Sequence, residues 1–155
     1  SEEPDSWVAS GFNVQPGQPV YASRTGTVVE IVGRSRTSKA ESWYHTWTNS
    51  VTVLQPDGTL ICYRNVIDPD EKLKVNEKIF AGQQIGVVPP NSKELILLIF
   101  QNSLNSDDLR FIIPQYVTGE DKTELLISSK EYKVAHPEKI RGMEMTRRER
   151  RKILK

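Results

Sequence analysis

The chain has little cysteine and little histidine: one cysteine and two histidines among 155 residues. A single cysteine, Cys62, excludes an internal disulfide and a Cys-x-x-Cys pair. Cys62 stands in the apolar sequence Leu60–Tyr63, and free cysteine is among the most buried residue types, so we expect it inside a strand. A cysteine-poor chain is compatible with both reducing and oxidising compartments, and composition therefore leaves the compartment open.

Long hydrophobic runs and an excess of one charge are also missing. The longest apolar run, Leu95 to Phe100, has six residues, whereas a transmembrane helix needs about 18 or more. The beginning of the chain shows no signal-peptide pattern. A formal net charge of +1 gives no overall electrostatic reason to bind nucleic acid. We therefore expect neither a membrane span nor a nucleic-acid partner.

Charge is nevertheless concentrated at the two ends. Residues 1–6 form an acidic lead-in, and residues 147–155 carry six of the 21 basic residues. Thr146 and Glu149 have the spacing of a capping box, so we expect a short basic helix at about 146–155. This helix would end a C-terminal extension, residues 104–155. Its cations could contact an anionic surface or an acidic partner, or form a solvated face.

The run from Leu95 to Phe100 predicts a strand that is buried on both faces. Further strands are expected at 20–22, 27–32, 50–54, 60–63 and 85–88, and Asp57-Gly58 is typical of a hairpin turn. Together these segments predict a mainly β domain at residues 7–103. Residues 109–113 and 124–128 could be added strands or short helical pieces.

Five short motifs occur in an order that resembles the LytM/lysostaphin-type zinc peptidases, which are bacterial cell-wall endopeptidases. They are Gly17-x-Pro19-Val20-Tyr21-Ala22, Gly26-x-Val28, Asp57-Gly58, Tyr63 and Ala81-Gly82-Gln83-x-Ile85-Gly86. The resemblance covers about residues 8–102. It implies a mainly antiparallel β-sheet or sandwich of the LytM-type peptidase (duplicated hybrid motif) kind, with a groove across the sheet.

The same resemblance implies zinc-binding and catalytic positions, and this chain has replaced them. The family's His-x-Gly-x-Asp pattern falls on Ala9 and Asn13, its middle histidine on Asn65, and its late His-x-His on Leu97 and Ile99. Alanine, leucine and isoleucine cannot coordinate a metal, and the neutral carbonyl oxygen of Asn13 is a poor ligand for zinc. We therefore expect no bound zinc, no other cofactor and no catalysis.

A recognition role for the groove is the first hypothesis that remains. We expect Asn13, Tyr63 and Asn65 around the groove, together with Trp43, Tyr44 and Trp47 from an aromatic loop. Aromatic side chains supply much of the energy of protein and ligand contacts. The alternative for this loop is a lid that packs over the sheet.

The resemblance also implies where and with what such a module works. Degenerate family members serve as scaffolds and activators, so the expected partner is an envelope protein such as a cell-wall hydrolase, or peptidoglycan. The location would be extracytoplasmic, periplasmic or in the cell envelope of a bacterium. Two alternatives remain open: a metallopeptidase with an altered metal site, built from His45, His136 and a carboxylate, or a purely structural spacer domain.

Overall fold

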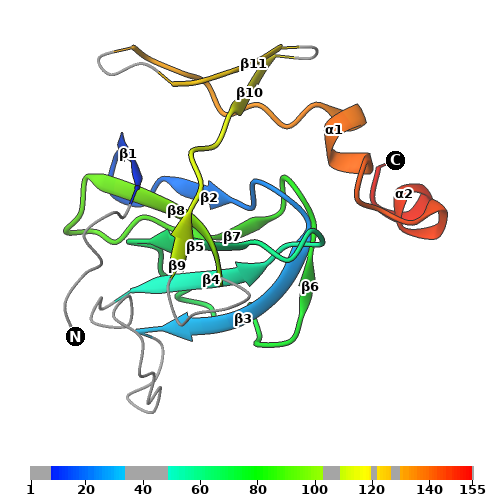
Figure 1. Cartoon of the computed structure of the whole chain (residues 1–155). Helices are drawn as coiled ribbons and strands as arrows, with labels where there is room; N and C mark the ends of the chain where they lie inside the picture. Colours follow the sequence, from blue (N-terminus) through cyan, green and yellow to red (C-terminus); the bar gives the residue numbers. More distant parts are fainter. Residues whose placement is uncertain (1–7, 34–48, 103–108, 120–121, 127–129, 155) are drawn as a thin grey trace.

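The protein is built around one antiparallel β-sheet (Figure 1). The computed structural model describes residues 8–33, 49–102, 109–119, 122–126 and 130–154. The sheet's strands are β1 (Ser10–Asn13), β3 (Gly26–Val32), β4 (Ser50–Leu54), β5 (Leu60–Arg64), β6 (Lys78–Ile79), β8 (Glu94–Asn102) and β9 (Leu109–Phe111). Their order is β1-β8-β5-β4-β3-β6, and β9 pairs with β8. The expected mainly antiparallel β architecture is confirmed.

β8 has sheet partners along both of its sides and lies next to the edge strand β1. It pairs with β5 along one side, while β1 and β9 pair with different parts of its other side. Leu97 packs in one buried cluster, and Leu98 and Phe100 pack in a second. Because neighbouring residues of a strand point to opposite faces, these clusters lie on the two sides of the sheet. The prediction of a strand buried on both faces is confirmed.

A two-stranded ribbon covers part of one face. It consists of β2 (Pro19–Tyr21) and β7 (Gln84–Val87), which pair antiparallel. Gly86 of the ribbon passes so close to the chain at Ile67 that a Cβ atom would collide with the Ile67 carbonyl oxygen. The larger buried cluster lies mainly between ribbon and sheet and includes Val20, Ala22, Val28, Val51, Val53, Ile61, Ile85 and Val88.

Cys62 lies on the opposite face of the sheet and is completely buried. Burial raises the pKa of its thiol to about 11, because a buried thiolate loses its hydration. The expectation of a buried strand cysteine is confirmed.

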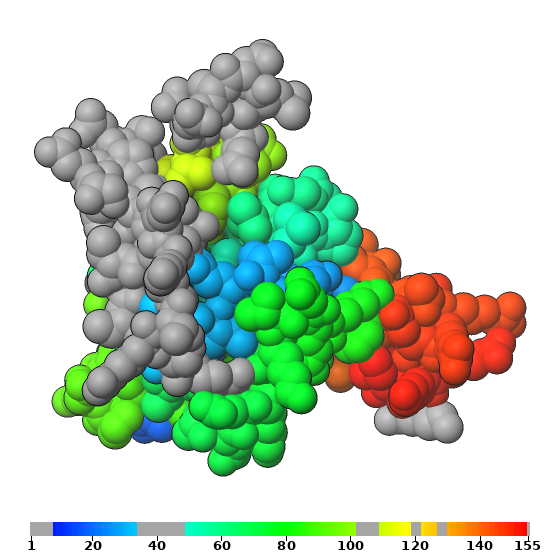
Figure 2. Space-filling view, turned by 90° about the horizontal axis from the view of Figure 1, so that it is seen from below, coloured from blue at the N-terminus to red at the C-terminus, as the bar shows by residue number. Residues whose placement is uncertain are grey.

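The C-terminal extension starts as part of the sheet, because β9 lies beyond residue 103 and still pairs with β8. The chain then forms a hairpin of β10 (Tyr116–Gly119) and β11 (Lys122–Glu124), followed by two short helices, α1 (Glu138–Gly142) and α2 (Arg147–Ile153). In Figure 1 the hairpin lies beyond β1, β2 and β8, and the helices lie at one end of the sheet. Figure 2 shows these helices against the segment that contains β6.

Three polar contacts attach the end of the extension to the body. Arg24 binds Glu144 through two nitrogens, at 3.1 and 2.9 Å. Arg141 donates to the Ala81 carbonyl oxygen at 3.1 Å. Lys78 pairs with Glu149 at 2.8 Å. The division of the chain into residues 7–103 and 104–155 stays a prediction, but these contacts make the two parts structurally interdependent.

α2 begins as the sequence predicts. The Thr146 hydroxyl accepts a hydrogen bond from the Glu149 amide at 3.2 Å, and the Glu149 carboxylate accepts one from the Thr146 amide at 2.7 Å. This reciprocal capping box confirms the expected N-cap. Within the described ranges, no helix is long and apolar enough to cross a membrane.

Candidate functional site

A groove of about 840 Å³ lies between the sheet and the C-terminal extension. One wall, the floor, comes from β1, β2, β5 and β8, from residues that flank them and from the β4–β5 turn. The opposite wall, the roof, comes from Leu126 and from residues within 112–118 and 132–144 of the extension. Its volume falls within the roughly 300–1,000 Å³ of small-molecule sites in proteins.

The floor is an apolar sheet face. Leu95, Leu97 and Ile99 of β8 alternate along the strand and all line the groove. On β5, Tyr63 pairs with Leu97 and Ile61 pairs with Ile99, and directly paired residues share one face of a sheet. This region therefore consists of hydrocarbon side chains and the buried Tyr63.

The roof is mostly apolar, and its polar lining residues are Gln115, Thr118, Lys133, His136 and Glu144. Its apolar residues include Ile112, Ile113, Pro114, Val117, Val134, Ala135, Ile140 and Met143. Tyr116 crosses from the roof to the floor and meets Phe12 of β1 edge to face, with ring centroids 5.8 Å apart. The two walls of the groove are thus joined by an aromatic contact.

Polar residues gather around Arg24 in the groove wall. Arg24 donates to Asp57 at 2.8 Å and to both oxygens of Glu144. Next to it in the chain, Ser23 donates its amide to the Tyr63 hydroxyl at 2.8 Å, and the two hydroxyls are 2.9 Å apart. Each of the three nitrogens of the Arg24 guanidinium therefore donates to a carboxylate.

These contacts change the acidity of the groups involved. Burial raises the pKa of Tyr63, although its bonds to Ser23 act in the opposite direction. Burial would also raise the pKa of Asp57, but hydrogen bonds from Thr59 and Arg24 outweigh it and lower the value to about 2. The hydrogen bonds with Glu144 raise the pKa of Arg24 further, despite partial burial. At neutral pH the cluster contains one guanidinium and ionised Asp57.

His136 lines the groove but has other partners. Its ring meets Tyr21 edge to face at 6.0 Å, and it makes a hydrogen bond to the Ala22 backbone. Burial lowers its pKa, and the nearby charge of Arg141 adds to this effect. A neutral imidazole packed in this way is a structural side chain that joins the extension to the ribbon.

Three of the positions implied by the peptidase resemblance, Asn13, Leu97 and Ile99, line the groove, whereas Ala9 and Asn65 do not. Strand register places Ser10 opposite Leu97 and Phe12 opposite Leu95, so Ala9, one residue out of phase, is not directed to the face that carries Leu97. Within the described ranges, no group of three His, Cys, Asp or Glu residues has a metal-binding arrangement. The side chains that do line the floor, Leu97 and Ile99, cannot bind zinc.

The expected recognition residues divide into three groups. Asn13 and Tyr63 line the groove, although the Tyr63 ring is 1% exposed and belongs to the core. Asn65 is not among the lining residues. Its side-chain amide donates to the backbone carbonyl oxygen of Glu94 at 3.1 Å. Trp43, Tyr44, Trp47 and also His45 lie outside the described residues.

Sequence reasoning missed the Arg24 cluster. Arg24 and Asp57 stand in turns that the sequence marks clearly, yet their pairing brings together residues 33 positions apart, and Glu144 is 120 positions from Arg24. A charged residue at a turn is ordinarily solvated, so its type alone gave no signal.

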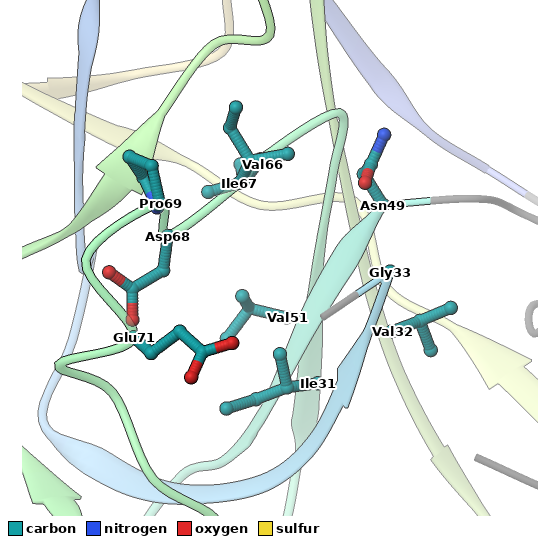
Figure 3. A pocket seen from close by; sticks show the side chains of 10 residues that line it. All are labelled: Ile31, Val32, Gly33, Asn49, Val51, Val66, Ile67, Asp68, Pro69 and Glu71. Atoms are coloured by element: carbon teal, nitrogen blue, oxygen red, sulfur yellow. The ribbon is translucent and has the colours of Figure 1, made fainter. Parts of the chain in front are cut away.

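A second, smaller pocket of about 200 Å³ lies at the ends of β3 and β4 (Figure 3). Ile31, Val51 and Val66 supply its apolar side chains, and Asp68 and Glu71 supply carboxylates. One Asp68 oxygen accepts the Leu73 amide at 2.7 Å and so stabilises the local turn. The larger groove is the better candidate site, because it has two facing apolar walls.

Comparison with known proteins gives a likeness of fold. No family model and no curated protein matches the chain. The solution structure of lysostaphin aligns with a TM-score of 0.49 and 21% identity, over 66% of this chain and 40% of that one. The catalytic domain of the antimicrobial peptidase lysostaphin from Staphylococcus simulans gives 0.47 and 21%, over 65% and 71%.

A third structure, a glycyl-glycine endopeptidase LytM from Ruminococcus gnavus, gives a TM-score of 0.45 and 16% identity, over 63% of this chain and 39% of that one. The chain thus spans less than half of the first and third of these structures. Because all three scores and identities are low, the residues of the groove carry the functional argument.

Proposed function

We propose that this chain is a non-catalytic, peptidase-like module that binds a partner in its groove, within the bacterial cell envelope. The motif resemblance between residues 8 and 102 supports the family part of this proposal. The replacement of ligand and catalytic positions by Ala9, Asn13, Asn65, Leu97 and Ile99 supports the non-catalytic part.

The single observation that carries the proposal is the chemistry of the groove floor. A catalytic zinc site requires about three nitrogen, sulfur or carboxylate ligands and an open position for water. Here Leu95, Leu97 and Ile99 supply only hydrocarbon to the floor, so these residues do not fit a zinc ion. His136, a groove histidine, is engaged by Tyr21 and the Ala22 backbone.

The two facing walls of the groove support binding. The Phe12–Tyr116 contact and the ion pair of Arg24 with Glu144 hold the roof against the body. A site with walls already in place loses little conformational entropy when a ligand enters. The proposed partners are an envelope protein such as a cell-wall hydrolase, or peptidoglycan, and both rest on the motif resemblance.

The first experiment is to measure metal content. Purified protein is incubated with zinc, desalted and analysed by native and elemental mass spectrometry. We expect close to no zinc per chain and no chelator-sensitive digestion of purified peptidoglycan. Close to one zinc per chain, with such digestion, would contradict the proposal and favour the metallopeptidase with an altered site.

A second experiment tests binding. Co-sedimentation with purified peptidoglycan, and the activity of a purified cell-wall hydrolase with and without the protein, report the two proposed partners separately. We expect one of them to respond in a manner that depends on the groove. If neither responds, or if substitutions in the groove leave both unchanged, the chain acts as a spacer instead.

A further inference from the structure

We propose that the groove holds a linear hydrocarbon chain, specifically the acyl chain of a lipid in which it is carried by an ester or amide. This inference rests on the proposed function, namely that the groove binds and does not cleave. It adds the chemical class of the ligand. The ligand class and the proposed function can fail separately.

The floor accepts hydrocarbon better than peptide. The backbone N–H and C=O groups of β5 and β8 pair within the sheet, so the sheet face offers side chains alone. Along this face those side chains are Leu95, Leu97 and Ile99. A peptide lying on them would lose water from its amide groups without gaining hydrogen bonds there, whereas an acyl chain has no such groups to satisfy.

The roof supplies the second apolar wall. Among the described residues, the three most exposed large apolar side chains are Met143 at 71%, Ile113 at 68% and Val134 at 62%. All three line this groove. Exposed apolar side chains that gather at one site mark an interaction surface. An acyl chain held between roof and floor would cover these three side chains. A ligand on the outer surface of the roof would not contact the floor.

The polar cluster indicates what the other end of the ligand is. Arg24 pairs with Asp57 and Glu144 through three of its five N–H groups, so two carboxylates already neutralise one guanidinium and a third would be repelled there. The half-buried Ser23 hydroxyl, bonded to the buried Tyr63 hydroxyl, is a neutral polar group beside this cluster. A neutral, oxygen-rich head group therefore suits the Arg24 cluster better than the ionised head of a free fatty acid.

The test uses the whole chain and a fluorescent polyene chain probe, which becomes brighter in apolar surroundings. Unlabelled monopalmitoylglycerol is added as competitor, below the concentration at which it forms micelles. We expect monopalmitoylglycerol to displace the probe at a lower concentration than palmitate does. Monobutyrylglycerol, which has the same head and a short chain, should not displace it, because the apolar area it buries is small.

Two surface variants locate the site. The double variant Ile113→Asp/Val134→Asp puts charge into the roof. We expect that displacement of the probe from this variant needs about tenfold more monopalmitoylglycerol. The matched control is Val75→Asp/Leu125→Asp, which changes two other exposed apolar residues, at 48% and 55%, outside the groove lining. The control should bind as the unaltered protein does.

A third variant, Ile99→Gln, tests the floor, with thermal melting followed by circular dichroism to verify folding. The inference is overturned if the probe does not bind, if the control loses binding as much as the roof variant, or if palmitate is preferred. An extended apolar peptide that displaces the probe equally well also overturns it. Loss of chain binding with retained partner binding refutes the ligand class alone, whereas bound zinc with peptidase activity refutes the proposed function.

Discussion

Asp57 has two roles, one in each of its oxygens. One oxygen accepts the Thr59 amide at 3.0 Å and the Thr59 hydroxyl at 2.6 Å, which stabilises the turn between β4 and β5. The other accepts Arg24 at 2.8 Å. Both roles require the ionised carboxylate, because a protonated acid loses its charge and part of its acceptor capacity.

This dual role of Asp57 predicts that the folded protein loses stability at low pH. The pKa of Asp57 is lowered from the usual 3.8 to about 2 in the folded protein. Its contribution to stability is therefore complete above the higher value and is lost as pH falls from about 4 to about 2. We expect the free energy of unfolding, measured with urea, to fall over this range, and to fall less steeply in Asp57→Asn.

The control for this titration is Asp70→Asn, because Asp70 is 70% exposed and makes only a 3.5 Å pair with Lys72. Exposed pairs of this kind contribute little to stability. Asp70→Asn should keep the slope of the unaltered protein. An unchanged slope in Asp57→Asn would show that other carboxylates account for the acid sensitivity.

The environment of a residue was predictable from sequence where its neighbours in the chain determine that environment, and not elsewhere. The burial of Cys62 followed from the apolar strand around it. The environment of Tyr63 did not, because a strand buried on both faces has no alternation to indicate which side faces the groove. Asn65 lies just beyond β5 at a φ of 67°, and this backbone turn takes it away from the groove.

Among the elements, α2 is specified most locally. Its N-cap, its reciprocal capping box and its basic last turn all lie within residues 146–153. The Lys78–Glu149 pair is its link to β6. Local specification is the reason that the sequence predicts this helix correctly, whereas residues 109–113, which contain β9, fit a strand or a short helical piece equally well from sequence.

The capping box can be tested directly. Thr146→Ala removes the hydroxyl that accepts the Glu149 amide, and we expect a loss of about 1 kcal/mol in helix stability. Hydrogen exchange of the α2 amides measures this loss, since it reports local opening. Arg148→Ala, an exposed change in the same helix, is the control. Equal exchange in the two variants would mean that α2 is held by packing alone.

On the scale of the whole molecule, Arg24 joins three distant parts of the chain. It connects the turn after the ribbon strand β2 with the β4–β5 turn and with the extension after α1. Arg24→Met keeps much of the side-chain volume and removes both ion pairs. Because the bond to Glu144 is two-fold and Glu144 is only 22% exposed, we expect a loss of about 1–2 kcal/mol in the free energy of unfolding.

Urea denaturation measures that loss, and Lys72→Met is the control. Lys72 is 82% exposed, so its removal should change the free energy of unfolding by less than about 0.5 kcal/mol. If Arg24→Met has an effect as small as the control, the extension is held against the body by β9 and by apolar packing, and not by this arginine.

The arrangement of the extension over the sheet could not be predicted from sequence. β8 was recognisable because six consecutive apolar residues are unusual outside a doubly buried position. The roof depends on contacts such as Arg24–Glu144 and Arg141–Ala81, which join residues 120 and 60 positions apart. No local pattern encodes such partners, so the sequence predicted a groove from resemblance and could not predict its second wall.

The pairing of β8 with both β1 and β5 also affects how the protein is made. β1 has β8 as its sheet partner, and β8 follows it by about 80 residues, which a ribosome adds in roughly 4–16 s at the usual rates of synthesis. During that interval β1 has been synthesised but has no strand to pair with. The sheet can be completed only when β9 has also emerged. The first strand of the sheet to be translated is therefore among the last to find its place, and the nascent chain keeps an unpaired edge throughout its elongation.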